Sequence, residues 1–435
     1  MNKRAVRWLY QELPELINKG ILNQETVAKI RDYYGEIKSA NKTSVALIIC
    51  GTIGAFLIGL GIILILAHNW EQFSRLTRAI LSFAPLVIGQ ALAIWVLLKR
   101  PQSSALKEGA ATFLSLMVGA SIALISQTYN IPGDTGTFVM TWMFLIIPLA
   151  YLMQASLPAI IYLIGITFWS GSFWDNPDKT VLFWPLAALA VPHFIWTLRQ
   201  NIYAIRSAIF AFVVVICCSV GAGFSLGNSW PGSWVIVFPA LYAIFYFLGS
   251  WKFSQITTNW QRPLRFIGAV GLFILAFQFT FRFVWQYLGT SNYGIAGESS
   301  GVSLLLSRFI TVVIIAASVL LFYDNLKRRN TLIALAGAVP LLALAAYFLK
   351  SSILLPTLIF NAYLFSLSIT FIMLGLRKNS LANVNAGMLM LAMLIIARFF
   401  DSDISFIIKG LIFIIVGIGF LSINMLIMRR KRGAE

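Results

Sequence analysis

The chain has 435 residues, of which 59% are hydrophobic and 11% are charged, whereas charged residues make up about 25% of an ordinary soluble domain. This composition excludes an ordinary soluble domain. A net charge of +18 would suggest nucleic-acid binding in a soluble protein, but in a membrane protein it is typical of Lys and Arg in cytoplasmic loops. We therefore expect a polytopic membrane protein with membrane lipids, and no nucleic acid, as its partners.

Residues 1–43 precede the first apolar stretch and are largely polar. Leu9, Leu13 and Leu16 recur at helical spacing, and Asn23 can cap a second short helix. Two short amphipathic helices are too small to hold a core of their own. We expect this cytoplasmic arm to pack on the ends of the helix bundle or to lie in the headgroup layer. It is either a topology anchor or a docking site for a protein partner.

Fourteen apolar stretches follow, and each is long enough for a helix that rises about 1.5 Å per residue to cross about 30 Å of hydrocarbon. They predict an all-α transmembrane helix bundle. The predicted spans are 44–67, 79–98, 109–127, 137–153, 155–171, 180–198, 203–224, 232–249, 264–286, 302–323, 331–349, 353–376, 381–399 and 404–428.

The spans divide into two halves of seven, residues 44–225 and 226–428, and a basic tail at 429–435 follows. Halves with an odd number of spans lie in opposite orientations, as an inverted repeat requires. The two halves share no matching motif, so the repeat is a geometric alternative only.

The positions of the charges predict the orientation. With the N-terminus in the cytoplasm, most of the 33 Lys and Arg residues fall in the inside gaps, and about half of the acidic residues fall in or beside the outside gaps. Cytoplasmic loops carry such an excess of basic residues. Both termini are therefore predicted to be cytoplasmic.

A few charged residues fall at the outer ends of the spans: Arg282, Arg308, Arg398, Asp401 and Lys409. A charge at membrane depth costs about 2.5–3.5 kcal/mol on insertion scales, and such residues usually face a protein interior or water. One interpretation is an internal ion pair between Arg398 and Asp401, with the other side chains reaching to the headgroups. The other is a cationic pocket for an anionic lipid head group, a sugar phosphate or a carboxylate.

Two outer loops add polar groups at the same predicted level. His68 and Glu71 are weak catalytic candidates, because a histidine beside a carboxylate can transfer protons near neutral pH. Gln127, Tyr129 and Asp134 are candidates for substrate binding, and we expect both loops to meet over the basic residues. The alternative is that each loop caps its own helix and places its aromatic side chains in the headgroup layer.

Neither a metal nor a cofactor is expected. The only two histidines, His68 and His193, are predicted near opposite faces of the membrane, and no Cys, His or carboxylate cluster has the spacing of a zinc site. Phosphate-binding glycine motifs are also missing from the sequence. The three cysteines lie in apolar stretches and form no disulfide framework.

Four short segments carry a resemblance to a known family. They are LINKGI at 16–21, GIILILAHNW at 61–70, ISQTYNIPGD at 125–134 and ARFFD at 397–401. These segments resemble the bacterial predicted membrane protein family called domain of unknown function 2157, mainly over residues 1 to about 150. The resemblance implies a multi-pass protein of the bacterial inner membrane, and it supplies no activity, substrate or catalytic residue.

Three functions remain open. The first is a transporter or flippase-like protein for an anionic envelope lipid or glycan precursor, which should show a polar cavity from the midplane to one face. The second is a membrane-embedded transferase acting at the outer face, in which His68 should lie close to an acid in an open, lipid-facing cleft. The third is a non-catalytic scaffold or sensor subunit, whose interior should be filled.

Overall fold

A computed structural model describes residues 3–34, 70–200, 204–226, 230, 232–252, 262–290, 301–349, 351–377 and 380–401, together with 411, 414 and 417–419. The predicted span 44–67, and all but a few positions of the predicted span 404–428, lie outside the described residues. The described residues are helical and contain no strand. The chain divides into two compact units, residues 1–78 and 79–435.

The first unit contains the two helices predicted for the arm, α1 (Lys3–Asn18) and α2 (Gln24–Tyr34). The side chain of Asn23 accepts a hydrogen bond of 2.8 Å from the backbone N–H of Thr26, which confirms the predicted cap. Leu13 and Val27 are buried. A short 3₁₀ turn, η1 (Trp70–Gln72), precedes the first helix of the membrane bundle.

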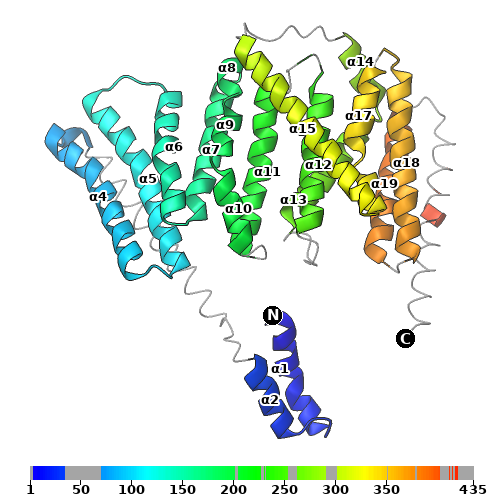
Figure 1. Ribbon diagram of the computed structural model, residues 1–435, viewed down its shortest axis with the longest axis horizontal. Helices are drawn as coiled ribbons and strands as arrows, with labels where there is room; N and C mark the ends of the chain where they lie inside the picture. The colour runs from blue at the N-terminus through cyan, green and yellow to red at the C-terminus, as the bar shows by residue number, and fades with distance from the viewer. Residues whose placement is uncertain are drawn as a thin grey trace. The chain divides into compact units, whose positions relative to one another are not determined.

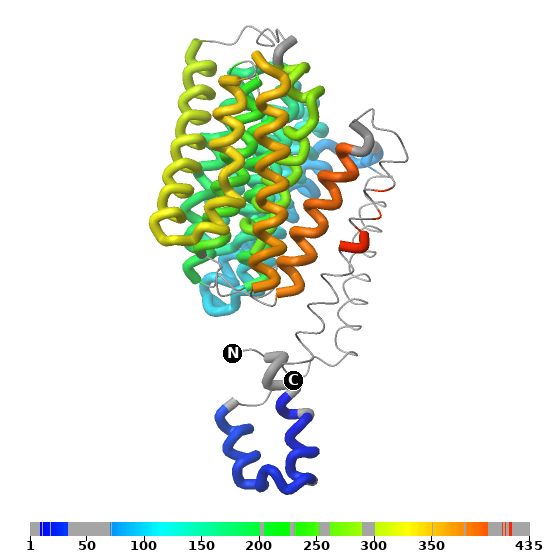
Figure 2. The backbone as a smooth tube through the Cα atoms, turned by 90° about the vertical axis from the view of Figure 1, so that its right-hand side faces the viewer, coloured from blue at the N-terminus to red at the C-terminus, as the bar shows by residue number. Residues whose placement is uncertain are grey.

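The second unit is a series of apolar segments that run alternately in opposite directions (Figures 1 and 2), and α8–α10 and α16–α17 each form one such segment. The first of them, α4, begins at Arg75, within the last four residues of the first unit. In chain order the helices are α4 (Arg75–Lys99), α5 (Ser104–Tyr129), α6 (Thr135–Leu152), α7 (Ser156–Ser172), α8 (Pro177–Thr180), α9 (Phe183–Ala188), α10 (Val191–Gln200), α11 (Ile205–Ser225), α12 (Trp234–Lys252), α13 (Pro263–Gln278), α14 (Arg282–Thr290), α15 (Gly301–Lys327), α16 (Thr331–Ala336), α17 (Val339–Phe348), α18 (Leu354–Arg377) and α19 (Leu381–Asp401).

Ten helical segments among the described residues are long and apolar enough to cross a membrane, and an eleventh is obtained if α13 and α14 form one broken span. The helix α7 is apolar but has only 17 residues. A multi-pass helical membrane protein is thereby confirmed. The count of fourteen spans and the cytoplasmic position of both termini stay predictions.

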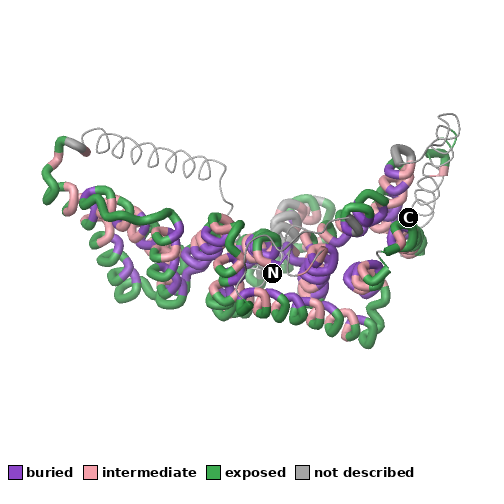
Figure 3. Tube along the Cα trace, turned by 90° about the horizontal axis from the view of Figure 1, so that it is seen from above, coloured by how far each residue is buried: buried purple, intermediate pink, exposed green. Residues whose placement is uncertain are grey.

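Neighbouring helices of the second unit pack in a continuous series. The pairs α5–α6, α6–α7, α7–α11 and α11–α13 are in contact, α12 packs on α13, α15 and α17, and α18 packs on α19. Figure 3 shows that buried residues gather where helices meet, while exposed residues cover the outward faces. Exposed leucine, isoleucine and phenylalanine side chains suit these faces to contact with lipid.

Close helix contacts depend on small residues, because the hydrophobic effect does not drive association between helices in lipid. At Gly268 on α13, an added Cβ atom would lie 2.5 Å from the backbone nitrogen of Tyr246 on α12. Only glycine allows the two backbones to approach so closely.

Candidate functional site: a cavity between three helices

The loop between α5 and α6 is shaped by its own sequence. Asn130 ends α5 in the left-handed conformation with φ 48°, which asparagine tolerates better than most residues. Pro132 and Gly133 follow, and the side chain of Asp134 then caps α6 by accepting a hydrogen bond of 2.5 Å from the backbone N–H of Thr137. One alternative in the sequence analysis was that each outer loop caps its own helix. Asp134 confirms it for this loop.

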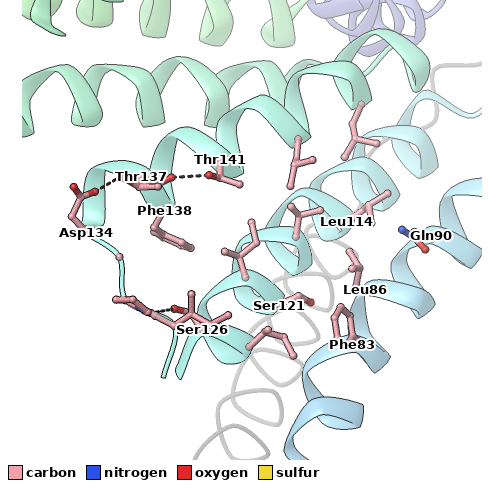
Figure 4. A pocket seen from close by; sticks show the side chains of 18 residues that line it. Phe83, Leu86, Gln90, Leu114, Ser121, Ser126, Asp134, Thr137, Phe138 and Thr141 are labelled. Atoms are coloured by element: carbon pink, nitrogen blue, oxygen red, sulfur yellow. Dashed lines mark hydrogen bonds between the residues drawn. The ribbon is translucent and has the colours of Figure 1, made fainter. Parts of the chain in front are cut away.

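A cavity of about 630 Å³ lies beside this loop, between α4, α5 and α6. Its walls are mostly apolar, and Phe83, Ile131 and Leu145 in the walls are themselves about half exposed. Figure 4 shows α4 on one side of the cavity and α5 and α6 on the others. The residues that line it are Phe83, Leu86, Gln90, Leu114, Val118, Ser121, Ile122, Ile125, Ser126, Ile131, Pro132, Gly133, Asp134, Thr137, Phe138, Thr141, Leu145 and Leu149.

Half of the polar lining residues lie along one face of α6. Asp134, Thr137 and Thr141 follow one another at helical spacing on α6, and Leu145 and Leu149 continue the same face. This face therefore changes from polar to apolar along the cavity, beginning at the end of the cavity where Asp134 lies.

Every hydroxyl group in the lining already donates its proton within the protein. Ser121 donates to the carbonyl of Ser82 at 2.7 Å, Ser126 to the carbonyl of Ile131 at 3.1 Å and Thr141 to the carbonyl of Thr137 at 2.8 Å. The hydroxyl of Thr137 hydrogen-bonds to the carboxylate of Asp134. A hydroxyl that donates once still has acceptor lone pairs, so these side chains offer acceptors to a bound molecule.

Asp134 is the charged group of this lining. Hydrogen bonds from the backbone and the side chain of Thr137 lower the pKa of Asp134, so that its carboxylate is ionised at neutral pH. Lys179 also lowers the pKa of Asp134, although its ammonium nitrogen lies 3.7 Å from the centre of the Phe173 ring and is not part of the lining.

A second polar group surrounds the break between α13 and α14, which are bent by 82°. The amide of Asn361 donates to the carbonyl of Thr280 at 3.1 Å, and the indole of Trp285 donates to the carbonyl of Phe279 at 2.9 Å. Arg398 donates to the hydroxyl of Thr280 at 3.4 Å and lies 5.1 Å from the centre of a phenylalanine ring. The hydrogen bonds from Asn361 and Trp285 satisfy carbonyl groups that the interrupted helix exposes.

The predicted site residues are only partly brought together. Of Gln127, Tyr129 and Asp134, only the last lines the cavity, and the other two are exposed near the end of α5. Arg282 and Arg308 are exposed on α14 and α15.

Figures 1 and 3 show α5 and α6 well separated from α14 and α19 within the second unit, with α7, α11 and α12 between them. The structure therefore does not join the α5–α6 loop to the arginines in one site.

Other predicted contacts are not tested by the described side chains. His68 and Lys409 lie outside the described residues, and Glu71 belongs to η1 in the first unit. Asp401 is the last residue of α19, and its predicted ion pair with Arg398 stays a prediction. No group of three or more His, Cys, Asp or Glu residues among the described residues could hold a metal ion.

One polar contact had no signal in the local sequence. Glu108 on α5 accepts hydrogen bonds from the backbone N–H groups of Ser156 and Leu157 at 2.8 and 3.0 Å, at the start of α7. It also forms an ion pair of 3.0 Å with Arg206 on α11, and both side chains are mostly buried. Arg206 in turn donates to the carbonyl of Gln154. This cluster ties three helices together at the end opposite to Asp134.

Residues 14–159 match the model of a family described as predicted membrane protein (DUF2157), which confirms the resemblance seen in the sequence. The matched region contains every described residue that lines the cavity, since these residues run from Phe83 to Leu149. No curated protein and no solved structure matches the chain significantly.

Proposed function

We propose that this multi-pass membrane protein is a transporter or flippase-like protein that moves an envelope lipid across a bacterial inner membrane, with the cavity between α4, α5 and α6 as its binding site. The main support for the proposal is the length of that cavity along the helices. On α6 its lining runs from Asp134 to Leu149, which corresponds to about 22 Å of helix at 1.5 Å per residue. That is most of a hydrocarbon layer about 30 Å thick.

The lining suits an amphipathic molecule. Its volume of about 630 Å³ lies within the range of about 300–1,000 Å³ typical of ligand pockets. Polar side chains at Asp134, Thr137 and Thr141 are followed by apolar ones at Leu145 and Leu149. A lipid could place its head group on the polar part and an acyl chain along the apolar part. Gln90 on α4 adds a further polar group to the lining.

The basic residues at helix ends support the predicted orientation. Of the helices that run in the same direction as α4 (Figure 1), α10, α12, α15 and α18, like α4 itself, end in a basic residue or carry one in the last turn, and α6 does not. These residues are Lys99, Arg199, Lys252, Lys327 and Arg377.

Of the helices that run the other way, α5, α7, α11, α13 and α17 carry no basic residue in the last turn, and α19 carries Arg398. We therefore place the Lys99 end in the cytoplasm and the Asp134 end outside. In a variant whose native cysteines are replaced, a cysteine at position 133 should react with an impermeant thiol reagent added to intact cells, and one at position 101 only after lysis. The reverse pattern would contradict this orientation.

The arginines of the sequence analysis do not define the substrate of this cavity, because none of them lines it. Arg398 lies instead beside the broken span of α13 and α14. Broken helices of this kind line the substrate sites of many transporters, so this region is consistent with the proposed activity. The filled aromatic interior around α14 would equally suit a scaffold, and the experiment below separates the two functions.

The test is lipid translocation by the purified full-length chain in proteoliposomes. A lipid with a fluorescent acyl chain and an unmodified head group, placed in the inner leaflet, should become accessible to an impermeant quencher faster than in protein-free vesicles. Leu145→Trp fills the cavity and should reduce this rate roughly tenfold. Leu116→Trp is the matched control, because Leu116 is similarly exposed on α5 and does not line the cavity.

Translocation no faster than in protein-free vesicles would overturn the proposal and favour a scaffold. Equal rates for Leu145→Trp and Leu116→Trp would show that this cavity is not the path.

A further inference from the structure

The chemistry of the cavity lining selects one kind of head group. The hydroxyl protons of Ser121, Ser126, Thr137 and Thr141 are all donated within the protein. What remains on these side chains is acceptor capacity. A ligand that makes hydrogen bonds to them must therefore bring donors.

The charge of the lining has the same consequence. Asp134 is ionised at neutral pH and is exposed at the cavity, and no Lys or Arg occurs among the described residues that line it. Lys179, the cation that influences Asp134, lies against the ring of Phe173. An anionic group in this lining would face a carboxylate and hydroxyl lone pairs, which is unfavourable.

We infer that the cavity binds a lipid whose head group carries a primary ammonium, with that ammonium at Asp134 and an acyl chain along Leu145 and Leu149. An ammonium supplies three donors and no acceptor, and it forms a charge-assisted hydrogen bond with a carboxylate. This inference rests on the proposed function, since it names the substrate class of the same cavity. A lipid with an ammonium head group differs from the anionic substrate expected from the sequence.

The competing explanation is that Asp134 only caps α6. Asparagine separates the two roles, because Asn and Asp are about equally good at the N-cap position. Asp134→Asn keeps the acceptor for the N–H of Thr137 and removes the charge. Thr141→Val is a second variant that removes a hydroxyl acceptor with little change in volume, and it leaves the cap untouched.

The test uses purified full-length protein in vesicles that contain phosphatidylethanolamine or phosphatidylglycerol with the same photoreactive acyl chain. Crosslinks are mapped to peptides of α5 and α6. The wild-type chain should be labelled roughly tenfold more by the ethanolamine lipid, which is the size of effect expected from one charge-assisted hydrogen bond. Asp134→Asn should reduce this preference to about twofold or less, and Thr141→Val should reduce it partly. Leu145→Trp should reduce labelling by both lipids, and Leu116→Trp should leave it unchanged.

Equal labelling by the two lipids, a preference for phosphatidylglycerol, or a preference unchanged in both Asp134→Asn and Thr141→Val would overturn the inference. None of these results affects translocation through the cavity, which the proteoliposome assay measures separately. Conversely, selective labelling without translocation would support an ethanolamine-lipid binding site and overturn the transport function alone.

Discussion

Two regions of the second unit differ in how they are packed. In the cavity sector, α4 to α6, the buried cluster between α4 and α5 is small (Ala93, Val96, Ala111, Leu114, Met153 and Ala155), the other face of α6 packs on α7, and a cavity of about 630 Å³ lies between the three helices. In the packed sector, α12 to α19, a much larger cluster is centred on Phe279, Trp285 and Phe360, whose ring centres lie 5.0–6.0 Å apart. The cavities around this cluster and at the end of α15 are about 60 and 220 Å³.

This difference in packing indicates which of the two sectors has room for a bound molecule. In lipid, helices associate through close packing and hydrogen bonds rather than by removal of apolar surface from water. An unfilled space therefore loses contact energy that nothing else replaces. The packed sector fills its space with its own side chains, whereas the cavity sector leaves room for another molecule.

The largest effect is expected in the packed sector at Gly268. Gly268→Leu should abolish recovery of folded protein, because even a Cβ atom would lie 2.5 Å from the backbone nitrogen of Tyr246. The measurement is the yield of monodisperse protein after detergent extraction. Gly109→Leu is the control, since no atom lies within 4 Å of a Cβ atom added there. If both variants were recovered equally, the tight contact between α12 and α13 would be contradicted.

A smaller effect is expected when an aromatic side chain is removed from each sector. Trp285 is fully buried, and Trp285→Ala should lower the free energy of unfolding by about 3–5 kcal/mol. Phe83 is 48% exposed in the cavity wall, and Phe83→Ala should lower it by about 1 kcal/mol or less. Denaturant unfolding in mixed micelles gives both values. Equal losses would mean that the two sectors are packed alike.

The variant Trp285→Phe tests the hydrogen bond of Trp285 separately from the packing of its ring. It keeps an aromatic ring but removes the donor to the carbonyl of Phe279, and it should lower the free energy of unfolding by about 1–3 kcal/mol, the range for a buried acceptor left unsatisfied.

An effect smaller than that of Trp285→Ala concerns the contact that joins the cavity sector to its neighbours. Glu108 and Arg206 connect α5 to α7 and α11. A double-mutant cycle with Glu108→Ala and Arg206→Ala should give a coupling energy of about 1–2 kcal/mol, because the two residues share one network. Glu108→Gln should be milder than Glu108→Ala, since it still accepts a backbone hydrogen bond. Additive losses would show that the ion pair does not join these helices.

The helices were largely predictable from the sequence, and the break between α13 and α14 was not. The predicted span 79–98 corresponds to α4, and 353–376 corresponds to α18, because each is one continuous apolar stretch. The predicted span 264–286 is instead broken by 82°, although its sequence has neither proline nor glycine at the break. The break is stabilised by Asn361, which lies 81 residues away from its partner Thr280, and hydropathy cannot reveal such a contact.

The candidate site was predictable only where the signal is local. Asp134 was identified because it lies in a polar outer loop, and the helical spacing of Thr137 and Thr141 was a usable signal that was not recognised. The ion pair of Glu108 was not predicted, because its partner Arg206 is distant in sequence. The cavity itself arises from how three helices pack, which no single segment of sequence specifies.

The most direct test of the central claim is an experimental density map of the chain in nanodiscs containing phosphatidylethanolamine. We expect an elongated, non-protein density between α4, α5 and α6, with one end at Asp134 and the other near Leu149. In Leu145→Trp this density should be missing, while in Leu116→Trp it should remain. Protein side chains filling the same space in the wild-type map would contradict the account.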